Sequence, residues 1–195
     1  MRNYESYKDS GIEWIGEIPE HWMVKKLKYL GESIIGITYS PNDVTDEQNG
    51  TLVLRSSNIQ NGRLTYDDCV YINKEIPEKL LTKAGDILIC ARNGSADLVG
   101  KNACIDGNST GYTFGAFMTI LRTKHYRFLS YFLSSNIFKT QLGSFSTSTI
   151  NQLTSSFLNN LEVALPEEES EQEAIADFLD QKPTVWITLS RKSNN

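Results

Sequence analysis

AGDILICARNG, residues 84–94, is the best-defined strand in the sequence. Its apolar run ILI, residues 87–89, stands between a Gly-Asp turn and an Arg-Asn-Gly turn. A short apolar run with turn residues on both sides is typical of a strand that is buried on both faces. We therefore expect this stretch to form a buried strand.

Further strands are expected on both sides of this one. Each has β-branched or apolar content next to Gly, Asn or Pro. They are TLVLRSSNI at 51–59 with a turn at NGR, 61–63, LVGKNACI at 98–105, GAFMTILRT at 115–123 and NLEVALP at 160–166, together with a short strand or helix at 24–30. The middle of the chain is therefore predicted to be mostly sheet.

Two helices are expected after the sheet residues. Apolar residues recur three to five positions apart over about 126–142, which predicts one amphipathic helix that ends at Gly143. Ser170 and Glu173 stand at capping-box spacing, so the second helix is expected to begin there.

The size and composition fit one ordinary domain with an appendage. The chain has 195 residues, of which 39% are hydrophobic. The order of the expected elements predicts an α/β (α+β) fold, with a mixed-sheet domain over 1–165 and a helical arm over 166–195.

The location is predicted from cysteine usage and hydropathy. Cys69, Cys90 and Cys104 are odd in number and show no CxxC spacing, so we expect reduced thiols in a cytoplasmic protein. The chain begins without a basic segment and an apolar run, and no apolar stretch approaches about eighteen residues. Neither export nor membrane insertion is expected.

The negative net charge of −5 comes from one short stretch. Residues 162–181 hold eight acids and no base, whereas no acid lies between Asp106 and Glu162. That acid-free window carries basic side chains, which predicts a surface that can approach phosphate. Its Lys and Arg residues are Arg122, Lys124, Arg127 and Lys139.

No motif for catalysis is found. His21 and His125 are too few for a metal centre, and the sequence lacks HExxH, P-loop and GxGxxG patterns. A glycine-rich cofactor loop and the Asn/Asp-Pro-Pro-aromatic tetrapeptide of amino-methyltransferases are also missing. Asp67, Asp68 and Asp86 are better interpreted as turn acids than as a nuclease site, since no acid-x-Lys arrangement accompanies them.

Polar loops that follow the expected strands have the chemistry to read DNA. Arg pairs with guanine, Asn pairs with adenine, and Ser and Thr bind phosphates or base edges. The alternative is that these residues only form turns. The candidate DNA-contacting residues are Arg55, Ser57, Asn58, Arg92, Asn93, Ser95, Lys101, Lys124, Ser146, Thr147, Thr149 and Asn151.

Four strings in order resemble the specificity (S) subunit of type I restriction-modification systems over about residues 1–182. They are YKDSGIEWIGEIPEHWMVKKLKYL, LRSSNIQNGRL, LTKAGDILICARNGSADLVGKNACI and STSTINQLTSSFLNNLEVALPEEESEQEAIADFLDQK. The most recognisable part is Leu165-Pro166 followed by Glu171-Gln172, Ile175 and FLD at 178–180.

The resemblance implies a non-catalytic protein. It implies an α/β target recognition domain that binds double-stranded DNA, and a spacer helix that docks methylase subunits and possibly a restriction subunit. No cofactor is expected on this chain, and S-adenosylmethionine is expected on the methylase.

The sequence departs from that family in its extent. A full S subunit has two recognition domains, whereas one is present here, and Pro183 and a polar end follow Lys182. We expect a truncated or frame-shifted half subunit. The predicted partner-binding face of the arm consists of Ile175, Phe178, Leu179, Lys182 and Trp186.

Two functions follow as hypotheses. In the first, the arm pairs two copies into a homodimer that recruits methylases and reads a symmetric split site. In the second, the chain is a decoy that binds methylases without binding DNA, which the acidic stretch 162–181 favours. A third possibility concerns the arm alone, whose apolar face would fold back on its own domain.

Overall fold

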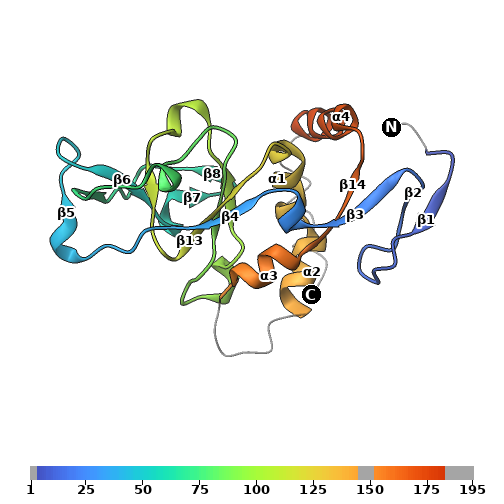
Figure 1. Cartoon of the computed structure of the whole chain (residues 1–195), viewed down its shortest axis with the longest axis horizontal. Helices are drawn as coiled ribbons and strands as arrows, with labels where there is room; N and C mark the ends of the chain where they lie inside the picture. The colour runs from blue at the N-terminus through green and yellow to red at the C-terminus, as the bar shows by residue number, and fades with distance from the viewer. Residues whose placement is uncertain (1–3, 145–151, 183–195) are drawn as a thin grey trace, which may run out of the picture.

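Four antiparallel strands form the central sheet of the computed structural model, which describes residues 4–144 and 152–182 (Figure 1). The strands lie in the order β11-β10-β13-β4. Their bounds are Glu32–Ile35 for β4, Ile87–Cys90 for β10, Asn102–Cys104 for β11 and Met118–Arg122 for β13. The best-defined strand of the sequence, β10, lies between two partners.

All four residues of β10 are buried, and they alternate between two hydrophobic clusters. Ile87 and Ile89 pack with the helices, whereas Leu88 and Cys90 pack with the second sheet. Successive side chains of a strand point to opposite faces, so an unbroken apolar run serves both sides. The prediction of a doubly buried strand is confirmed.

The second sheet is mixed, with the order β12-β6-β9-β5. Strand β12 pairs parallel with β6, and the other pairings are antiparallel. The bounds are Val44–Thr45 for β5, Thr51–Leu54 for β6, Tyr71–Ile72 for β9 and Thr113–Phe114 for β12. The predicted mixed-sheet α/β fold class is confirmed.

A hairpin stands at the predicted NGR turn. Strands β7, Ile59–Gln60, and β8, Arg63–Leu64, are joined by Asn61 and Gly62, whose φ angles are both positive, at 52° and 76°. Asn-Gly is the preferred pair for such two-residue turns because both positions tolerate the left-handed region.

One expected strand is shorter than predicted. The stretch 98–105 begins with a 3₁₀ turn at Ala96–Leu98 and becomes a strand only at Asn102. Gly100, with φ of 84°, separates the two parts, and its amide donates to the carbonyl of Cys90. The apolar residues 98 and 99 therefore belong to a turn.

The single helix predicted over 126–142 is wrong in one respect, because two helices occupy this stretch. Helix α1 spans Tyr126–Ser134 and α2 spans Asn136–Ser144. Ser135 is extended between them, and its hydroxyl donates to the carbonyl of Phe132 and accepts from the amide of Phe138. A serine that bonds to nearby backbone in this way interrupts a helix and caps the next one.

The predicted capping box of the last helix is also wrong. Helix α4 spans Glu169–Asp180 with Glu168 as its N-cap residue, so Ser170 lies inside the first turn. The amides of Glu171 and Gln172 already donate to the carbonyl of Glu168. The helix therefore starts before the Ser170 hydroxyl can act as a cap.

A strand near the N-terminus lies beside the last strand of the described residues. Strand β3, Trp22–Lys26, pairs antiparallel with β14, Glu162–Pro166 (Figure 1). Before β3, a separate hairpin joins β1, Tyr7–Asp9, and β2, Glu17–Pro19, and helix α3, Ser155–Asn160, leads into β14. Within the described residues, no helix is long and apolar enough to cross a membrane.

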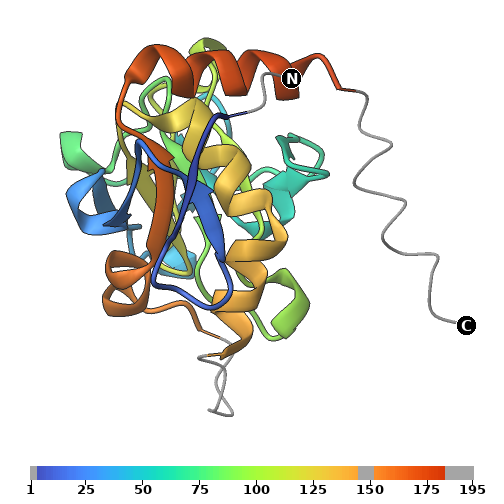
Figure 2. The same cartoon turned by 90° about the vertical axis from the view of Figure 1, so that its right-hand side faces the viewer.

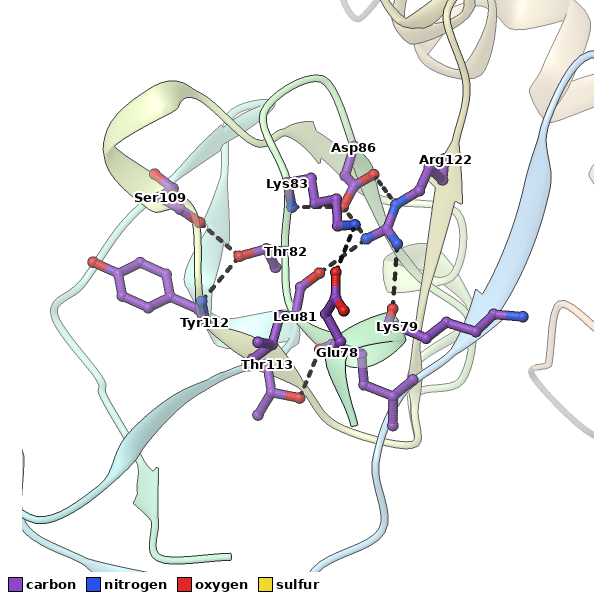
Figure 3. A network of polar contacts seen from close by, with 11 residues as sticks. Glu78, Lys79, Leu81, Thr82, Lys83, Asp86, Ser109, Tyr112, Thr113 and Arg122 are labelled. Atoms are coloured by element: carbon purple, nitrogen blue, oxygen red, sulfur yellow. Dashed lines mark hydrogen bonds and ion pairs between the residues drawn. The ribbon is translucent and has the colours of Figure 1, made fainter. Parts of the chain in front are cut away.

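Asp86 and Arg122 fix the turn before β10 to the end of β13. Arg122 donates to both carboxylate oxygens of Asp86, and also to the carbonyls of Lys79 and Leu81 (Figure 3). The nearby Thr82 hydroxyl donates to the carbonyl of Ser109 and accepts from the amide of Tyr112. Asp86 is thus a structural turn acid, as the sequence favoured.

Candidate functional site

Two of the predicted loops lie against each other at one end of the sheets. One is the 3₁₀ turn Ser56–Asn58 after β6, and the other follows β10. The Asn93 side-chain amide donates to the Ser56 hydroxyl at 3.1 Å, and the Lys101 ammonium donates to the Ser56 carbonyl at 3.1 Å. Loops that are far apart in sequence therefore share one surface.

The third predicted loop lies mostly outside the described residues, which resume at Gln152. Gln152 forms an isolated antiparallel bridge with Arg92, and the Leu153 amide donates to the Ala91 carbonyl at 2.7 Å. The end of this loop is thus beside the other two. The candidate residues Ser146, Thr147, Thr149 and Asn151 fall in the part that the structure does not describe.

A groove of about 1220 Å³ runs between these loops and the start of β13. We call it the loop groove. It combines basic and polar side chains with aromatic rings, a composition that suits nucleic acid. Its lining includes Tyr39, Arg55, Ser57, Asp68, Arg92, Asn93 and Phe117.

The guanidinium of Arg55 is bound by another residue of the same loop region, Asp68. Its Nη2 lies 2.8 Å from the Asp68 carboxylate and also donates to the Asp68 carbonyl at 3.3 Å. The Arg55 Nε and the Ser57 hydroxyl are buried, and neither has a hydrogen-bond partner among the described residues. Arg55 is thus held as part of the groove wall.

The guanidinium of Arg92 lies over the ring of Phe117, with 5.2 Å from its carbon to the ring centroid. Phe117 is 60% exposed, and its carbonyl accepts from the amides of Ala91 and Arg92. Arg92 is itself exposed. An exposed stack of this kind keeps the planar arginine fork in one orientation.

Asn58 does not face the loop groove. It is fully buried, its amide donates to the carbonyls of Thr65 and Asp68, and its side-chain oxygen accepts from the Arg55 amide. These bonds hold the turn, so Asn58 is left out of the contact surface. Ser95 is exposed beside the groove, where its amide donates to the Asn93 side chain.

The sequence pattern does not single out Phe117. The strand predicted over 115–123 contains it, and an apolar residue inside a strand needs no further explanation. Strand β13 begins at Met118, so Phe117 lies in the turn that precedes this strand. Gly115, two residues before Phe117, is the sequence feature that indicates this turn, since glycine often marks turns.

The prediction of an acid-free basic surface is wrong. Lys124 pairs with Glu169, and Arg127 contacts Glu173 at 2.5 Å and Asp177 at 2.7 Å. Helix α4 lies along α1 and brings its acids to these bases (Figure 2). Lys124 follows the far end of β13, so it is also distant from the loop groove.

The two faces of α4 have different surroundings. The face with Gln172 and Ala176, both buried, docks on its own domain, and His125 Nδ1 lies 2.8 Å from the Gln172 side-chain oxygen. The predicted partner-binding face is the other one. Ile175, Phe178 and Leu179 line a second groove of about 1120 Å³ next to the N-terminal segment, here called the arm groove.

The partner-binding face keeps its apolar residues accessible. Phe178 is 38% exposed, and the Lys182 ammonium lies 4.5 Å from its ring centroid. Ile175 and Leu179 are half-buried. Trp186 lies outside the described residues. The docking of α4 on its own domain is thus centred on Gln172 and Ala176, next to the predicted partner-binding face rather than on it.

Glu171 connects α4 to the N-terminal segment. Its carboxylate accepts from the Tyr4 hydroxyl at 2.8 Å and from Trp22 Nε1 at 3.0 Å, and it lies 2.8 Å from His21 Nε2. Partial burial alone would raise the pKa of this carboxyl, but hydrogen bonds from Trp22, His21 and Tyr4 outweigh burial, so the pKa is lowered. The carboxylate thus supports the wall of the arm groove.

No group of three or more His, Cys, Asp or Glu side chains in residues 4–144 and 152–182 is arranged to hold a metal ion. The side chains available at the loop groove are instead hydrogen-bond donors and aromatic rings.

Comparisons with known proteins agree on one family. The family model described as "Type I restriction modification DNA specificity domain" matches residues 19–195. The EcoKI specificity subunit of Escherichia coli (strain K12) and the StySPI specificity subunit of Salmonella potsdam are each 27% identical over 172 residues, which is 85% of this chain and 37% of theirs.

Solved structures show the same fold. The HsdS subunit from Thermoanaerobacter tengcongensis matches with a TM-score of 0.67 and 20% identity, over 97% of this chain and 43% of that one. A chain from a structure of a type I R-M system matches with a TM-score of 0.70 and 21% identity, over 95% and 43%. The chain thus spans less than half the length of these relatives, and it belongs to the type I restriction-modification DNA specificity domain family.

Proposed function

We propose that the chain reads one half of a split DNA site for a type I restriction-modification complex and has no catalytic role of its own. The observation that carries this proposal is the convergence of loops after β6 and β10, and of Gln152, around one groove. Arg92 and Asn93 supply the donors and acceptors that base edges and phosphates require.

The proposed partners are double-stranded DNA and a methylase subunit, with a restriction subunit as a further possible member of the complex. S-adenosylmethionine would be held by the methylase. The relatives that support this assignment carry the name specificity subunit. The methylase would dock on the arm.

We further propose that two copies pair through the arm groove and so read a symmetric site. Ile175, Phe178 and Leu179 form an apolar strip at coiled-coil spacing, and Lys182 continues it. A twofold pair of recognition domains would prefer inverted repeats.

The experiment uses the full chain with its cognate methylase. Duplexes with a randomised core are incubated with the complex, and bound or methylated molecules are sequenced. An enriched inverted repeat supports the proposal, together with affinity that falls as salt rises. Recovery of no preferred sequence would overturn it. Sedimentation of the chain alone, and of Phe178→Asp, tests pairing separately.

The decoy hypothesis loses one of its supports. The acids of 162–181 that favoured it are largely paired, with Glu169 bound to Lys124 and with Glu173 and Asp177 bound to Arg127. They lie on the α1 side of the molecule rather than at the loop groove. A decoy would lower methylation at the site of an intact enzyme and would create no new site when the two are mixed.

A further inference from the structure

The loop groove contains two arginines, and they are held in different ways. Arg55 is tied to Asp68 by an ion pair and a backbone hydrogen bond. The guanidinium of Arg92 has a ring contact with Phe117 but no hydrogen bond or ion pair with any described residue. In the described part of the groove, Arg92 is therefore the arginine whose donors are available.

Stacking on Phe117 restricts the guanidinium without using its donors. A cation over a ring face is held by the quadrupole of the ring, and the N–H groups of a guanidinium lie in its plane and point outward. The Phe117 carbonyl also accepts from the amides of Ala91 and Arg92, at 2.9 and 3.0 Å, which fixes the backbone of both partners. The arginine fork is thus oriented before any ligand arrives.

The fork matches one base edge in particular. Guanine presents O6 and N7 in the major groove as two adjacent acceptors, and bidentate pairing with arginine is the commonest specific contact to DNA. Adenine and cytosine each present a donor there, which the donor-only guanidinium cannot match.

We propose that the Arg92–Phe117 pair reads a guanine in the recognised half-site. Arg92 makes the base contact, and Phe117 is a positioning residue that acts through Arg92. Arg55 belongs to the groove wall and does not read a base. This inference rests on the proposed function, because it names the base that the same groove would recognise.

The test compares guanine with 7-deazaguanine, which lacks the N7 acceptor, at each guanine of the site selected by the full chain with its cognate methylase. In the wild type, 7-deazaguanine at one position is expected to weaken binding. In Arg92→Ala the affinity for the natural site falls about 5- to 150-fold, and that position no longer distinguishes the two bases. Other guanines keep their sensitivity.

Variants of Phe117 test whether its ring positions Arg92 or only stabilises the fold. Phe117→Ala is expected to reduce the discrimination at the same position, and Phe117→Tyr is expected to restore it, because a tyrosine ring also supports the stack. Arg63→Ala, an exposed arginine on β8, serves as the control and should leave the pattern unchanged.

The outcomes separate the two proposals. If the wild type selects a sequence but no guanine loses its 7-deaza sensitivity in Arg92→Ala, or if the site contains no guanine, the inference is overturned and the proposed function stands. If the wild type selects no sequence at all, both fail. Thermal unfolding of each variant confirms that these exposed substitutions leave the fold intact.

Discussion

Arg122 holds Asp86 through two parallel hydrogen bonds, of 2.8 Å from Nε and 2.7 Å from Nη2 (Figure 3). The Asp86 side chain is only 2% exposed, and it also accepts from the Lys83 amide at 2.8 Å. The hydrogen bond from Arg122 to Asp86 raises the pKa of the guanidinium, so the arginine stays charged. It anchors the turn that leads into the central strand β10.

Replacing Arg122 by alanine is expected to destabilise the fold by about 3–5 kcal/mol, since the buried carboxylate would lose its compensating charge. Urea unfolding followed by circular dichroism measures the loss. Lys139→Ala, at an exposed position of α2, is the control and should change stability by less than about 0.5 kcal/mol. Equal stability of the two variants would show that the pair contributes little.

Gly36 is required by the close approach of two chain segments. A Cβ atom there would lie 2.2 Å from the Phe114 carbonyl oxygen and 2.3 Å from that of Gly115. Gly36→Ala is therefore expected to cost about 1–3 kcal/mol by forcing backbone apart. Gly107→Ala, where a Cβ would meet nothing within 4 Å, is the matched control. Thermal unfolding of both variants should separate them clearly.

Local patterns were sufficient to predict much of the fold. The burial of β10 on both faces and the hairpin at Asn61 and Gly62 follow from apolar content and turn chemistry that neighbouring residues determine. The break at Ser135 was not predicted, because apolar periodicity continues across it while one hydroxyl changes the backbone path.

At the candidate site, residues that are far apart in the sequence make contacts that the sequence pattern does not predict. Lys124 and Arg127 have no acid near them in the sequence, yet α4 returns about 50 positions later to pair with them. In the other direction, the sequence alone could not distinguish the internal amide of Asn58 from the groove-lining Asn93. Both questions depend on tertiary contacts that no local pattern encodes.

Docking of α4 on α1 is expected to weaken in acid. The hydrogen bond from Tyr131, followed by that from Arg127, lowers the pKa of Asp180, and the hydrogen bond from Lys124 lowers the pKa of Glu169. Lowered folded-state pKa values mean that these contacts stabilise docking at and above the ordinary carboxyl range, and that this stabilisation is lost as pH falls below that range and through the folded-state values.

Amide hydrogen exchange over α4 between pH 6 and pH 3 measures this weakening. Exchange in Glu169–Asp180, corrected for its intrinsic pH dependence, should accelerate before exchange in β10 does. Arg127→Ala should produce the same loosening at neutral pH, because Arg127 contacts Glu173, Asp177 and Asp180. Simultaneous loss of protection in α4 and β10 would contradict a local effect.

Lys124→Ala distinguishes the arm from the DNA surface. Lys124 pairs with Glu169 and lies past the end of β13 that is opposite the loop groove, so its removal should loosen α4 and change DNA affinity by less than about twofold. Arg92→Ala should do the reverse. Binding curves at two salt concentrations and amide exchange over α4 give both readouts. If Lys124→Ala instead weakens all DNA sequences alike and lowers the salt dependence, the phosphate backbone must run along α1 and α4, and the proposed placement of DNA at the loop groove would have to be extended to that side.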